Sequence, residues 1–319
     1  MFSVTRTAKK ENDFMTTLNY QYIQSNDYTQ STVKELADET IDWLRQIMTA
    51  EPFETMMFLS GCRDEDVGVD EVEQSVTNGI AKCLLYDESI LNDTYVRNKI
   101  KQMVDKKVQQ AKIGKVYVEG SYDFAIPDLY ALAEHAFGME VKGLLVADES
   151  WNKRWVDKGA TKVAMMRSPL VAPAENQTRN IHYSAKANEW FKYIYSGNIM
   201  SIWDSGMIKC SDADYDGDIV LTTDNKYVVD AAVNGYCITY EKNKTKEQYI
   251  NDKSFANVDV RAFDTKIGFI TNLASNLIAM LSNFKPDSEE YKEIRRRIDL
   301  LRYYQGLVTW LSYTVMYNE

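Results

Sequence analysis

Residues 212–218 read Asp-Ala-Asp-Tyr-Asp-Gly-Asp, and an apolar run follows them directly. Carboxylates packed this closely repel one another, by about 1 kcal/mol for two unit charges 4 Å apart in bulk water and by several times more near a protein surface. A cation bound among them would remove this repulsion. In an extended chain Asp214, Asp216 and Asp218 share one face, and Gly217 lets the chain turn around a single ion. Oxygen ligands on a tight loop suit Mg²⁺ or Ca²⁺.

This acidic segment allows two interpretations other than a magnesium site. A solvated acidic turn fits poorly, because Ile219-Val220-Leu221 places the cluster at the mouth of a buried strand. An EF-hand starting at Asp212 has oxygen ligands and a glycine at the right positions, but its twelfth residue is Thr223 instead of glutamate. An EF-hand also needs helices on both sides, whereas these flanks predict strands. The sequence therefore predicts a magnesium site next to a strand.

Short apolar runs on both sides of this segment predict further strands. They are separated by glycines, prolines or charged turns, with helical inserts at 127–135 and 187–195. The predicted strands are 115–118, 143–146, 161–165, 219–223, 227–229 and 236–240. Short strands with uneven helical inserts favour a small irregular barrel over a doubly wound sheet.

Helical patterns flank the strand-rich region. A capping box of Thr32 and Glu35 predicts a helix start, and helical spacing also covers 72–85 and 94–111, before Gly114 ends the helical part. Two more helices are expected near the C-terminus, over 267–280 and after a cap at Asp287.

These patterns predict an α+β chain, a β-barrel flanked by N-terminal and C-terminal helical regions. We expect a disordered polar tail over 1–11, a helical connector over 12–112, the barrel with the acidic motif over 113–240 and a helical region over 241–319.

Composition limits the function classes. Cysteines and histidines are too few and too scattered for a structural zinc site, and unpaired cysteines in a chain of this size are typical of a reducing cytoplasm. These residues are Cys62, Cys83, Cys210, Cys237, His135 and His182. No signal sequence and no stretch of roughly 18 apolar residues is present, so we expect a cytoplasmic protein without a membrane span.

The charge balance argues against a general nucleic-acid coat. The chain has 37 Lys and Arg against 47 Asp and Glu, a formal net charge of −10. Basic groups do cluster at Lys106-Lys107, Lys153-Arg154 and Arg295-Arg296-Arg297, where they form either a local channel or solvated helix faces.

The acidic segment resembles the metal motif of the two-barrel RNA polymerases. This superfamily includes the largest subunit of cellular RNA polymerases, RNA-directed RNA polymerases of the eukaryotic type and single-chain phage polymerases, and its common core is Asp-x-Asp-Gly-Asp. Asp214, Asp216 and Asp218 match the three chelating and catalytic aspartates, and Tyr215 replaces the family's aromatic residue. Asp212 stands where the cellular enzymes have asparagine, a candidate substrate contact.

A second block supports this resemblance. Met166-Arg167-Ser168-Pro169-Leu170 resembles the family's Arg-x-Pro strand end, whose arginine approaches the ribose of the incoming nucleotide. Arg167 is therefore the candidate for sugar recognition. Looser similarity to phage-type members lies at 120–128, 143–145 and 267–272.

The resemblance implies nucleotidyl transfer with Mg²⁺, with Mn²⁺ as the alternative ion, on a nucleic acid template with ribonucleoside triphosphates. The family builds its active site from two double-psi β-barrels, so residues 113–240 are expected to form a six-stranded barrel of the double-psi type. The family's phosphate-binding lysines lie on the other barrel, and this sequence has room for only one. The segment 12–112 resembles the connector before the metal-bearing barrel, so the lysine barrel is expected upstream or on another chain. Two alternatives stay open: a non-catalytic remnant that binds metal or a partner barrel, and an unrelated magnesium-dependent phosphotransferase or nuclease.

Overall fold

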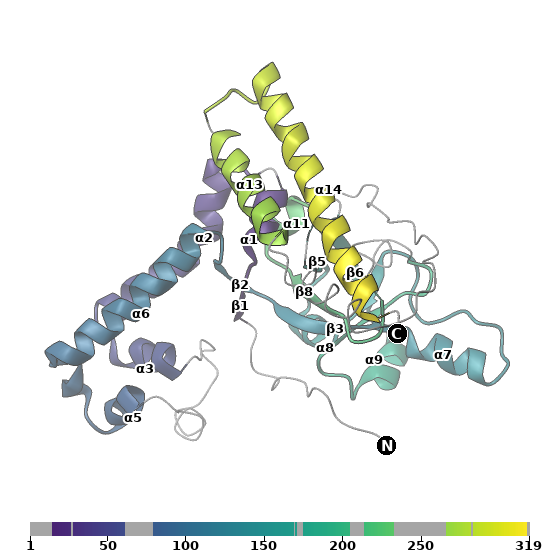
Figure 1. Cartoon of the computed structure of the whole chain (residues 1–319). Helices are drawn as coiled ribbons and strands as arrows, with labels where there is room; N and C mark the ends of the chain where they lie inside the picture. The colour runs from purple at the N-terminus through teal and green to yellow at the C-terminus, as the bar shows by residue number, and fades with distance from the viewer. Residues whose placement is uncertain are drawn as a thin grey trace, which may run out of the picture.

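The computed structural model describes residues 15–26, 28–60, 79–168, 170, 175–204, 214–232, 266–281 and 283–317. Within these ranges the chain forms a helical region, then a β-barrel with short helices around it, then two long helices that pack on each other (Figure 1). The predicted fold class, a barrel flanked by helices, is confirmed. No helix in the described ranges has both the length and the apolar character needed to span a bilayer.

The first helical region precedes the barrel and includes a short strand at each end. Its elements are β1 (Met15–Thr17), α1 (Tyr20–Ser25), α2 (Gln30–Met48), α3 (Pro52–Ser60), α5 (Gly79–Tyr86), η1 (Glu88–Asn92), α6 (Thr94–Lys112) and β2 (Tyr117–Glu119). β1 and β2 pair antiparallel in a two-stranded sheet outside the barrel.

The barrel closes in the order β3-β7-β4-β6-β5-β8. The elements of this part are β3 (Ser121–Pro127), α7 (Leu129–Ala136), β4 (Glu149–Trp151), α8 (Lys153–Lys158), β5 (Lys162–Met166), β6 (Gln177–Ile181), α9 (Ala185–Phe191), β7 (Gly197–Met200), β8 (Ile219–Thr223) and α11 (Lys226–Asp230). The two final helices are α13 (Lys266–Leu281) and α14 (Glu289–Tyr317).

Strand directions define two ends of the barrel. β3 is parallel to β7 and antiparallel to β8, and β5 is also antiparallel to β8. Consequently β3, β5 and β7 all finish at the end where β8 begins. We call this the aspartate end, because Asp218 directly precedes β8. β4 and β6, which are parallel to each other, also begin there, since β4 is antiparallel to β7.

The barrel interior contains polar as well as apolar side chains. Asp123 is 2% exposed and accepts hydrogen bonds from the Ser121 hydroxyl and, at 3.1 Å, from the Asn152 amide. Asn152 also donates to Asn198 at 2.9 Å. Burial raises the pKa of Asp123, although the Ser121 hydrogen bond, the charge of Arg154 and the Asn152 hydrogen bond oppose this. Such a network stabilises a fold only when its members find partners.

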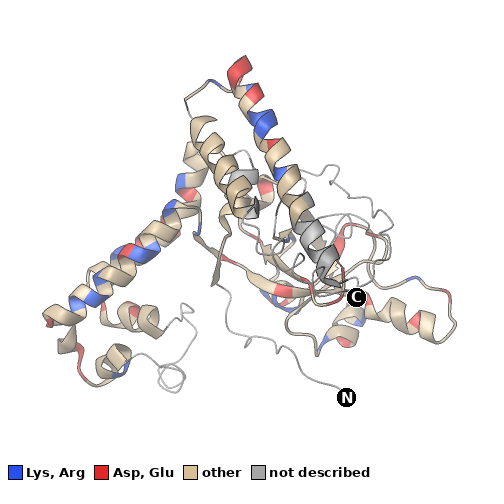
Figure 2. Cartoon of the chain, in the orientation of Figure 1, with Lys and Arg blue, Asp and Glu red and all other residues tan. Residues whose placement is uncertain are grey.

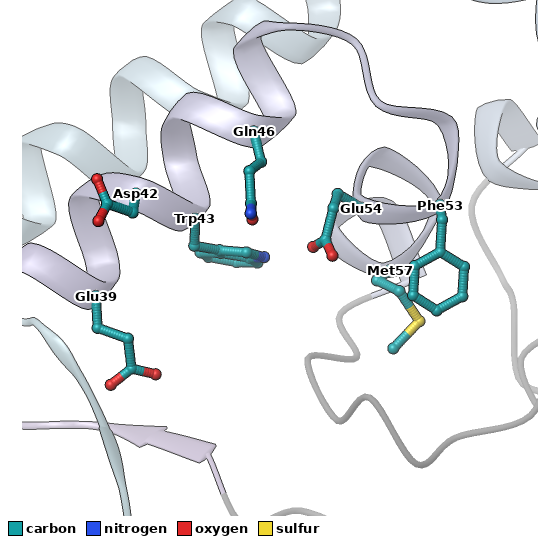
Figure 3. A pocket seen from close by; sticks show the side chains of 7 residues that line it. All are labelled: Glu39, Asp42, Trp43, Gln46, Phe53, Glu54 and Met57. Carbon is teal, nitrogen blue, oxygen red and sulfur yellow. The ribbon is translucent and has the colours of Figure 1, made fainter.

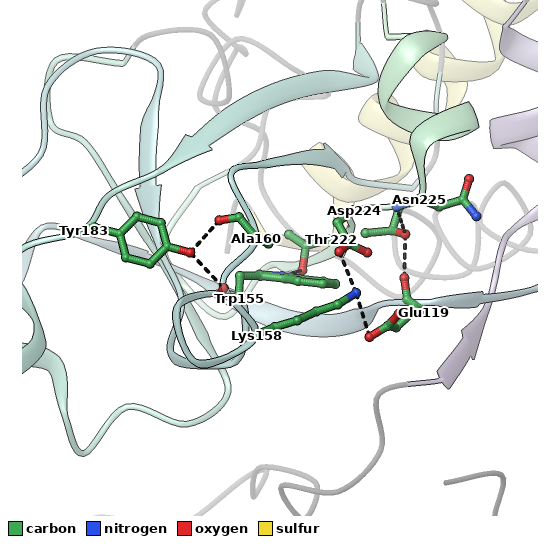
Figure 4. Close-up of polar contacts among 9 residues, drawn as sticks. Glu119, Trp155, Lys158, Ala160, Tyr183, Thr222, Asp224 and Asn225 are labelled. Carbon is green, nitrogen blue, oxygen red and sulfur yellow. Dashed lines mark hydrogen bonds and ion pairs between the residues drawn. The ribbon is translucent and has the colours of Figure 1, made fainter. Parts of the chain in front are cut away.

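A lysine joins the outer two-stranded sheet to the barrel (Figure 4). Lys158, at the end of α8, contacts Glu119 of β2 at 2.7 Å and Asp224 after β8 at 2.6 Å. Its ammonium lies 5.4 Å from the ring centroid of Trp155, whose indole N–H donates to Thr222 at 2.9 Å. These contacts fix the sheet, and with it the start of the barrel, against α8.

Several expected element boundaries need correction. The helix predicted to start at Thr32 is α2, which begins at Gln30 and is capped by Thr29; the Thr29 hydroxyl accepts the Thr32 N–H at 3.1 Å. Glu35, the expected capping partner, instead accepts a hydrogen bond from Tyr227. The second C-terminal helix, α14, is capped by the Ser288 hydroxyl, which accepts the N–H of Tyr291, and not by Asp287.

Two predicted strands are wrong, and five strands in the described part of the chain were not predicted. The run 143–146 has no strand pairing, because carboxylates of Asp128 and Glu134 take the backbone N–H groups of residues 142–145. The run 227–229 belongs to the short helix α11, whose N-cap Asn225 accepts from Tyr227. β1, β3, β4, β6 and β7 were missed. The run 115–118 overlaps β2, which lies outside the barrel. The expected tail 1–11 and strand 236–240 lie outside the described residues.

Candidate metal centre

Three aspartates meet at the aspartate end of the barrel. Asp214, Asp216 and Asp218 each offer a carboxylate oxygen, and these oxygens all lie within 4.8 Å of one another. The turn that brings them together passes through Gly217 at φ +128°, a backbone region that favours glycine. The structure thus brings together the three acidic side chains that the sequence predicted as a group.

Backbone hydrogen bonds hold this turn closed. The Asp214 N–H donates to Asp218 Oδ2 at 2.9 Å, and the Asp216 N–H donates to Asp214 Oδ1 at 3.2 Å. The carbonyl of Asp218 accepts the N–H of Ala125 at 2.9 Å, which attaches the turn to β3. The carboxylates therefore project from a turn that is continuous with the barrel wall.

Crowding of the carboxylates affects the pKa of Asp216. Its pKa is raised by its hydrogen bond to Asp214 and by the Asp214 charge, with smaller effects of burial and of Asp218, while Arg167 lowers it. Uncompensated negative charge and exposed oxygens are what a divalent cation requires. The donor set of three carboxylates therefore fits Mg²⁺ or Mn²⁺.

Arg167 directly follows β5 and reaches the same group. Its Nη2 lies 2.7 Å from Asp218 Oδ1, and the two side chains are 22% and 16% exposed. The chain beyond Arg167 is held by α1, far away in sequence. The Ser168 hydroxyl accepts from the Asn19 amide at 3.1 Å and lies 3.2 Å from the Tyr22 hydroxyl. Sequence reasoning selected Arg167 but did not find its support from α1.

A buried ion pair lies beside the aspartate turn. Arg179 of β6 pairs with Asp204, which follows β7, and their side chains are 3% and 5% exposed. Tyr215, within the turn, has a pKa raised first by burial and then by the charge of Asp204, while Arg179 lowers it. The chain leaving β7 thus lies near the turn. Sequence analysis did not single out either partner, since an arginine in a polar run carries no signal by itself.

The remaining predicted site residues are distributed as follows. Asp212 lies outside the described residues.

Among the basic clusters, Lys107 donates to the Tyr117 hydroxyl, Lys153 pairs with Asp157 within α8, and Arg154 is buried. Arg296 and Arg297 both pair with Glu293 on α14. In Figure 2 basic positions predominate along α6, and acidic and basic positions alternate at the start of α14. These pairings favour solvated helix faces over a basic channel.

The two histidines lie apart from the aspartate turn in the chain. His182 Nδ1 is 2.9 Å from Glu149 Oε2, a contact between the chain after β6 and the start of β4. His135 is exposed near the end of α7.

A separate cavity of about 270 Å³ lies between α2 and α3 (Figure 3). Acidic and apolar side chains line it: Glu39, Asp42, Trp43, Gln46, Phe53, Glu54 and Met57. No residue of the aspartate turn contributes, so the cavity is not part of the metal centre.

No protein-family model matches the chain. It is 24% identical over 262 residues to the DNA-directed RNA polymerase YonO of Bacillus phage SPbeta, which covers 80% of this chain and 29% of that protein. Its fold is similar to that of the RNA dependent RNA polymerase QDE-1 from Thielavia terrestris, with a TM-score of 0.52 at 12% identity, covering 93% of this chain and 35% of that one. The chain thus spans only about a third of either protein. The expected similarity to two-barrel RNA polymerases is confirmed.

Proposed function

We propose that this chain is the aspartate-bearing barrel of an RNA polymerase that transfers nucleotidyl groups with the help of Mg²⁺. One observation carries the proposal: three carboxylates on a single turn converge within 4.8 Å at one end of a closed barrel. The similarity to a DNA-directed and to an RNA dependent RNA polymerase supports it. Template nucleic acid and ribonucleoside triphosphates are the proposed substrates.

Asp214, Asp216 and Asp218 are the residues that would hold the ion. A bound Mg²⁺ would supply charge stabilisation and lower the pKa of a coordinated hydroxyl. The turn contributes by presenting the three carboxylates together, attached to β3 through the bond from Ala125. The guanidinium of Arg167 pairs with the charge of Asp218. If a bound ion took the place of the guanidinium beside Asp218, Arg167 could donate to a sugar hydroxyl instead.

The metal centre alone is poorly suited to hold a triphosphate. A triphosphate carries about four negative charges, and cationic groups must balance them during transfer. Arg167 is the basic side chain that the structure pairs with the aspartate group. We therefore place the phosphate-binding lysines on a second barrel, upstream in sequence or on another chain, with residues 12–112 as the connector.

Primer extension tests the proposal. The 319-residue chain is assayed with Mg²⁺, primed template and four ribonucleotides, alone and with the natural upstream region supplied in cis or trans, and Asp214→Ala serves as the blank. We expect no measurable synthesis by the chain alone and synthesis once the upstream barrel is present, lost in the blank. Synthesis by the chain alone, lost in the blank, would confirm the chemistry but refute the need for a second barrel.

The non-catalytic alternative predicts a different pattern. A remnant that only binds metal or a partner barrel would synthesise no RNA in any arm of the assay, while still binding Mn²⁺ in calorimetry. Cleavage of the template or primer that depends on Asp214 would instead indicate a magnesium-dependent nuclease.

A further inference from the structure

A tryptophan at the aspartate end is both exposed and fixed. Trp203 lies in the turn that follows β7, and 58% of its surface is exposed. Its indole N–H donates to the Lys142 carbonyl at 2.9 Å, and its backbone N–H donates to the Ser201 hydroxyl at 3.1 Å. Exposing so much of a large aromatic ring forgoes the free energy that its burial would contribute. The ring is held in place by its indole N–H and still exposed, so it is positioned to contact another molecule.

The support under Trp203 is rigid. Glu134 accepts the N–H groups of Lys142 and Gly143 at 2.7 and 2.8 Å, and Asp128 accepts those of Leu144 and Leu145 at 2.6 and 3.2 Å. Both carboxylates are buried. The Ser201 hydroxyl donates to the Leu145 carbonyl at 3.0 Å, which fastens the Trp203 turn to the same segment. Hydrogen bonds to buried charged groups are among the stronger ones in proteins.

Strand register places this turn beside the metal centre. Met200, the last residue of β7, is opposite Pro127, the last residue of β3. On the other side of β3, Ala125 bonds to Asp218 at the start of β8. The turn with Trp203 and the aspartate turn therefore leave the barrel at the same end and flank the same strand. Neighbouring strands are about 4.8 Å apart, so the two turns begin roughly 10 Å from each other.

We propose that Trp203 stacks on a base of single-stranded nucleic acid that enters the aspartate end. This inference rests on the proposed function for the ion site and adds a base-contacting residue to it. Aromatic side chains bind bases of any sequence through their faces, and a ring held in place loses little entropy when a base stacks on it. The Lys142 side chain is exposed and pairs with exposed Glu140, so it can turn to a phosphate at little cost.

Binding measurements separate stacking from charge. Fluorescence anisotropy compares a labelled single-stranded RNA with an abasic oligomer of equal length and charge, using the full chain, Trp203→Leu and Trp203→Phe. We expect Trp203→Leu to weaken binding of the RNA by about 5- to 100-fold. Binding of the abasic oligomer and the salt dependence should stay unchanged, because no charge is removed. Trp203→Phe, which keeps a ring, should restore most of the affinity.

Trp190→Leu is the matched control. Trp190 on α9 is 48% exposed, but its ring packs edge-on against Tyr130 with centroids 4.8 Å apart. We expect this variant to bind RNA like the unchanged chain. Photocrosslinking of the unchanged chain to RNA with 5-iodouridine, followed by peptide mass spectrometry, gives a second readout that requires no variant, and the crosslink is expected at Trp203.

Several results would overturn this inference. They are equal binding of RNA and the abasic oligomer by the unchanged chain, no binding of either, unchanged RNA affinity in Trp203→Leu, or a crosslink at Trp190 instead of Trp203. None of these results bears on the proposed function, which primer extension and Mn²⁺ binding test separately. If Trp203→Leu instead abolished association with the upstream barrel while RNA binding was unchanged, Trp203 would contact a protein.

Discussion

Replacing Arg167 with glutamine should make the metal centre bind divalent cations more tightly. Arg167 Nη2 lies 2.7 Å from Asp218 Oδ1, with both side chains mostly shielded from water. The guanidinium therefore occupies one of the carboxylates that the ion needs, and its positive charge also repels the ion. Glutamine keeps the approximate length of the side chain but removes the charge.

The size of the effect follows from Coulomb's law. Two unit charges 4 Å apart interact by about 1 kcal/mol in bulk water and about 4 kcal/mol at the effective dielectric constant near a protein surface. Because the Arg167 side chain is 22% exposed, its surroundings lie between bulk water and the protein surface value. We therefore expect the free energy of Mn²⁺ binding to improve by about 1–3 kcal/mol. This corresponds to Mn²⁺ binding that is about 5- to 100-fold tighter.

Calorimetric titration with Mn²⁺ measures this change. Arg45→Gln is the control, because it alters the net charge equally but breaks an exposed pair with Asp42 on α2. The control should bind Mn²⁺ like the unchanged chain. Unchanged or weaker binding in Arg167→Gln would refute the reasoning, since it would mean that Arg167 helps to shape the metal centre instead of competing for it.

Three further predictions test the centre and its supports. Asp216→Asn should abolish Mn²⁺ binding. In EDTA it should also raise the melting temperature at pH 7, because the raised pKa of Asp216 means that its charge destabilises the fold. This gain should disappear below about pH 4, where the carboxyl is protonated in both states, and melting curves at pH 7 and below pH 4 check it. Asp128→Ala should lower the free energy of unfolding in urea by about 3–5 kcal/mol, because buried N–H groups lose a charged acceptor. Burial lowers the pKa of Lys158, but its contacts with Asp224 and Glu119 outweigh this and raise the pKa. Lys158→Met should therefore destabilise by about 1 kcal/mol in urea at pH 8, and by progressively less as the pH rises above about 10.5, where the unfolded lysine loses its proton, toward the higher pKa of the folded state.

The aspartate turn could be predicted from sequence because its chemistry is local. Asp214, Asp216 and Asp218 alternate with residues that set their spacing, and Gly217 supplies the turn. Nothing distant in the chain is needed to bring the three carboxylates together. The supports of the centre are different, because Ser168 depends on Asn19 and Tyr22 from α1, and no local pattern reveals that contact.

The missed strands show where hydrophobic periodicity fails to predict a strand. β6 reads Gln-Thr-Arg-Asn-Ile, and Gln177, Thr178 and Arg179 are all buried. A strand whose buried positions carry amide, hydroxyl and guanidinium groups gives no alternation of apolar and polar residues. Buried Asn198 in β7 has the same effect. The polar interior of the barrel, with partners drawn from distant strands, hides these strands from sequence reasoning.

Acidic residues serve two opposite purposes at this end of the barrel, and backbone N–H groups decide which. Asp128 is fully buried, and its two oxygens accept N–H groups from Tyr130, Ala131, Leu144 and Leu145, so its charge is compensated without a cation. In the aspartate turn, as far as the chain is described, Asp214 and Asp218 each accept one backbone N–H. A carboxylate can accept about four hydrogen bonds. The crowded carboxylates of the aspartate turn therefore keep oxygen lone pairs that no backbone N–H occupies, and an ion can bind there. This difference in hydrogen bonding, rather than acidity, distinguishes the candidate metal centre from the carboxylates that support Trp203.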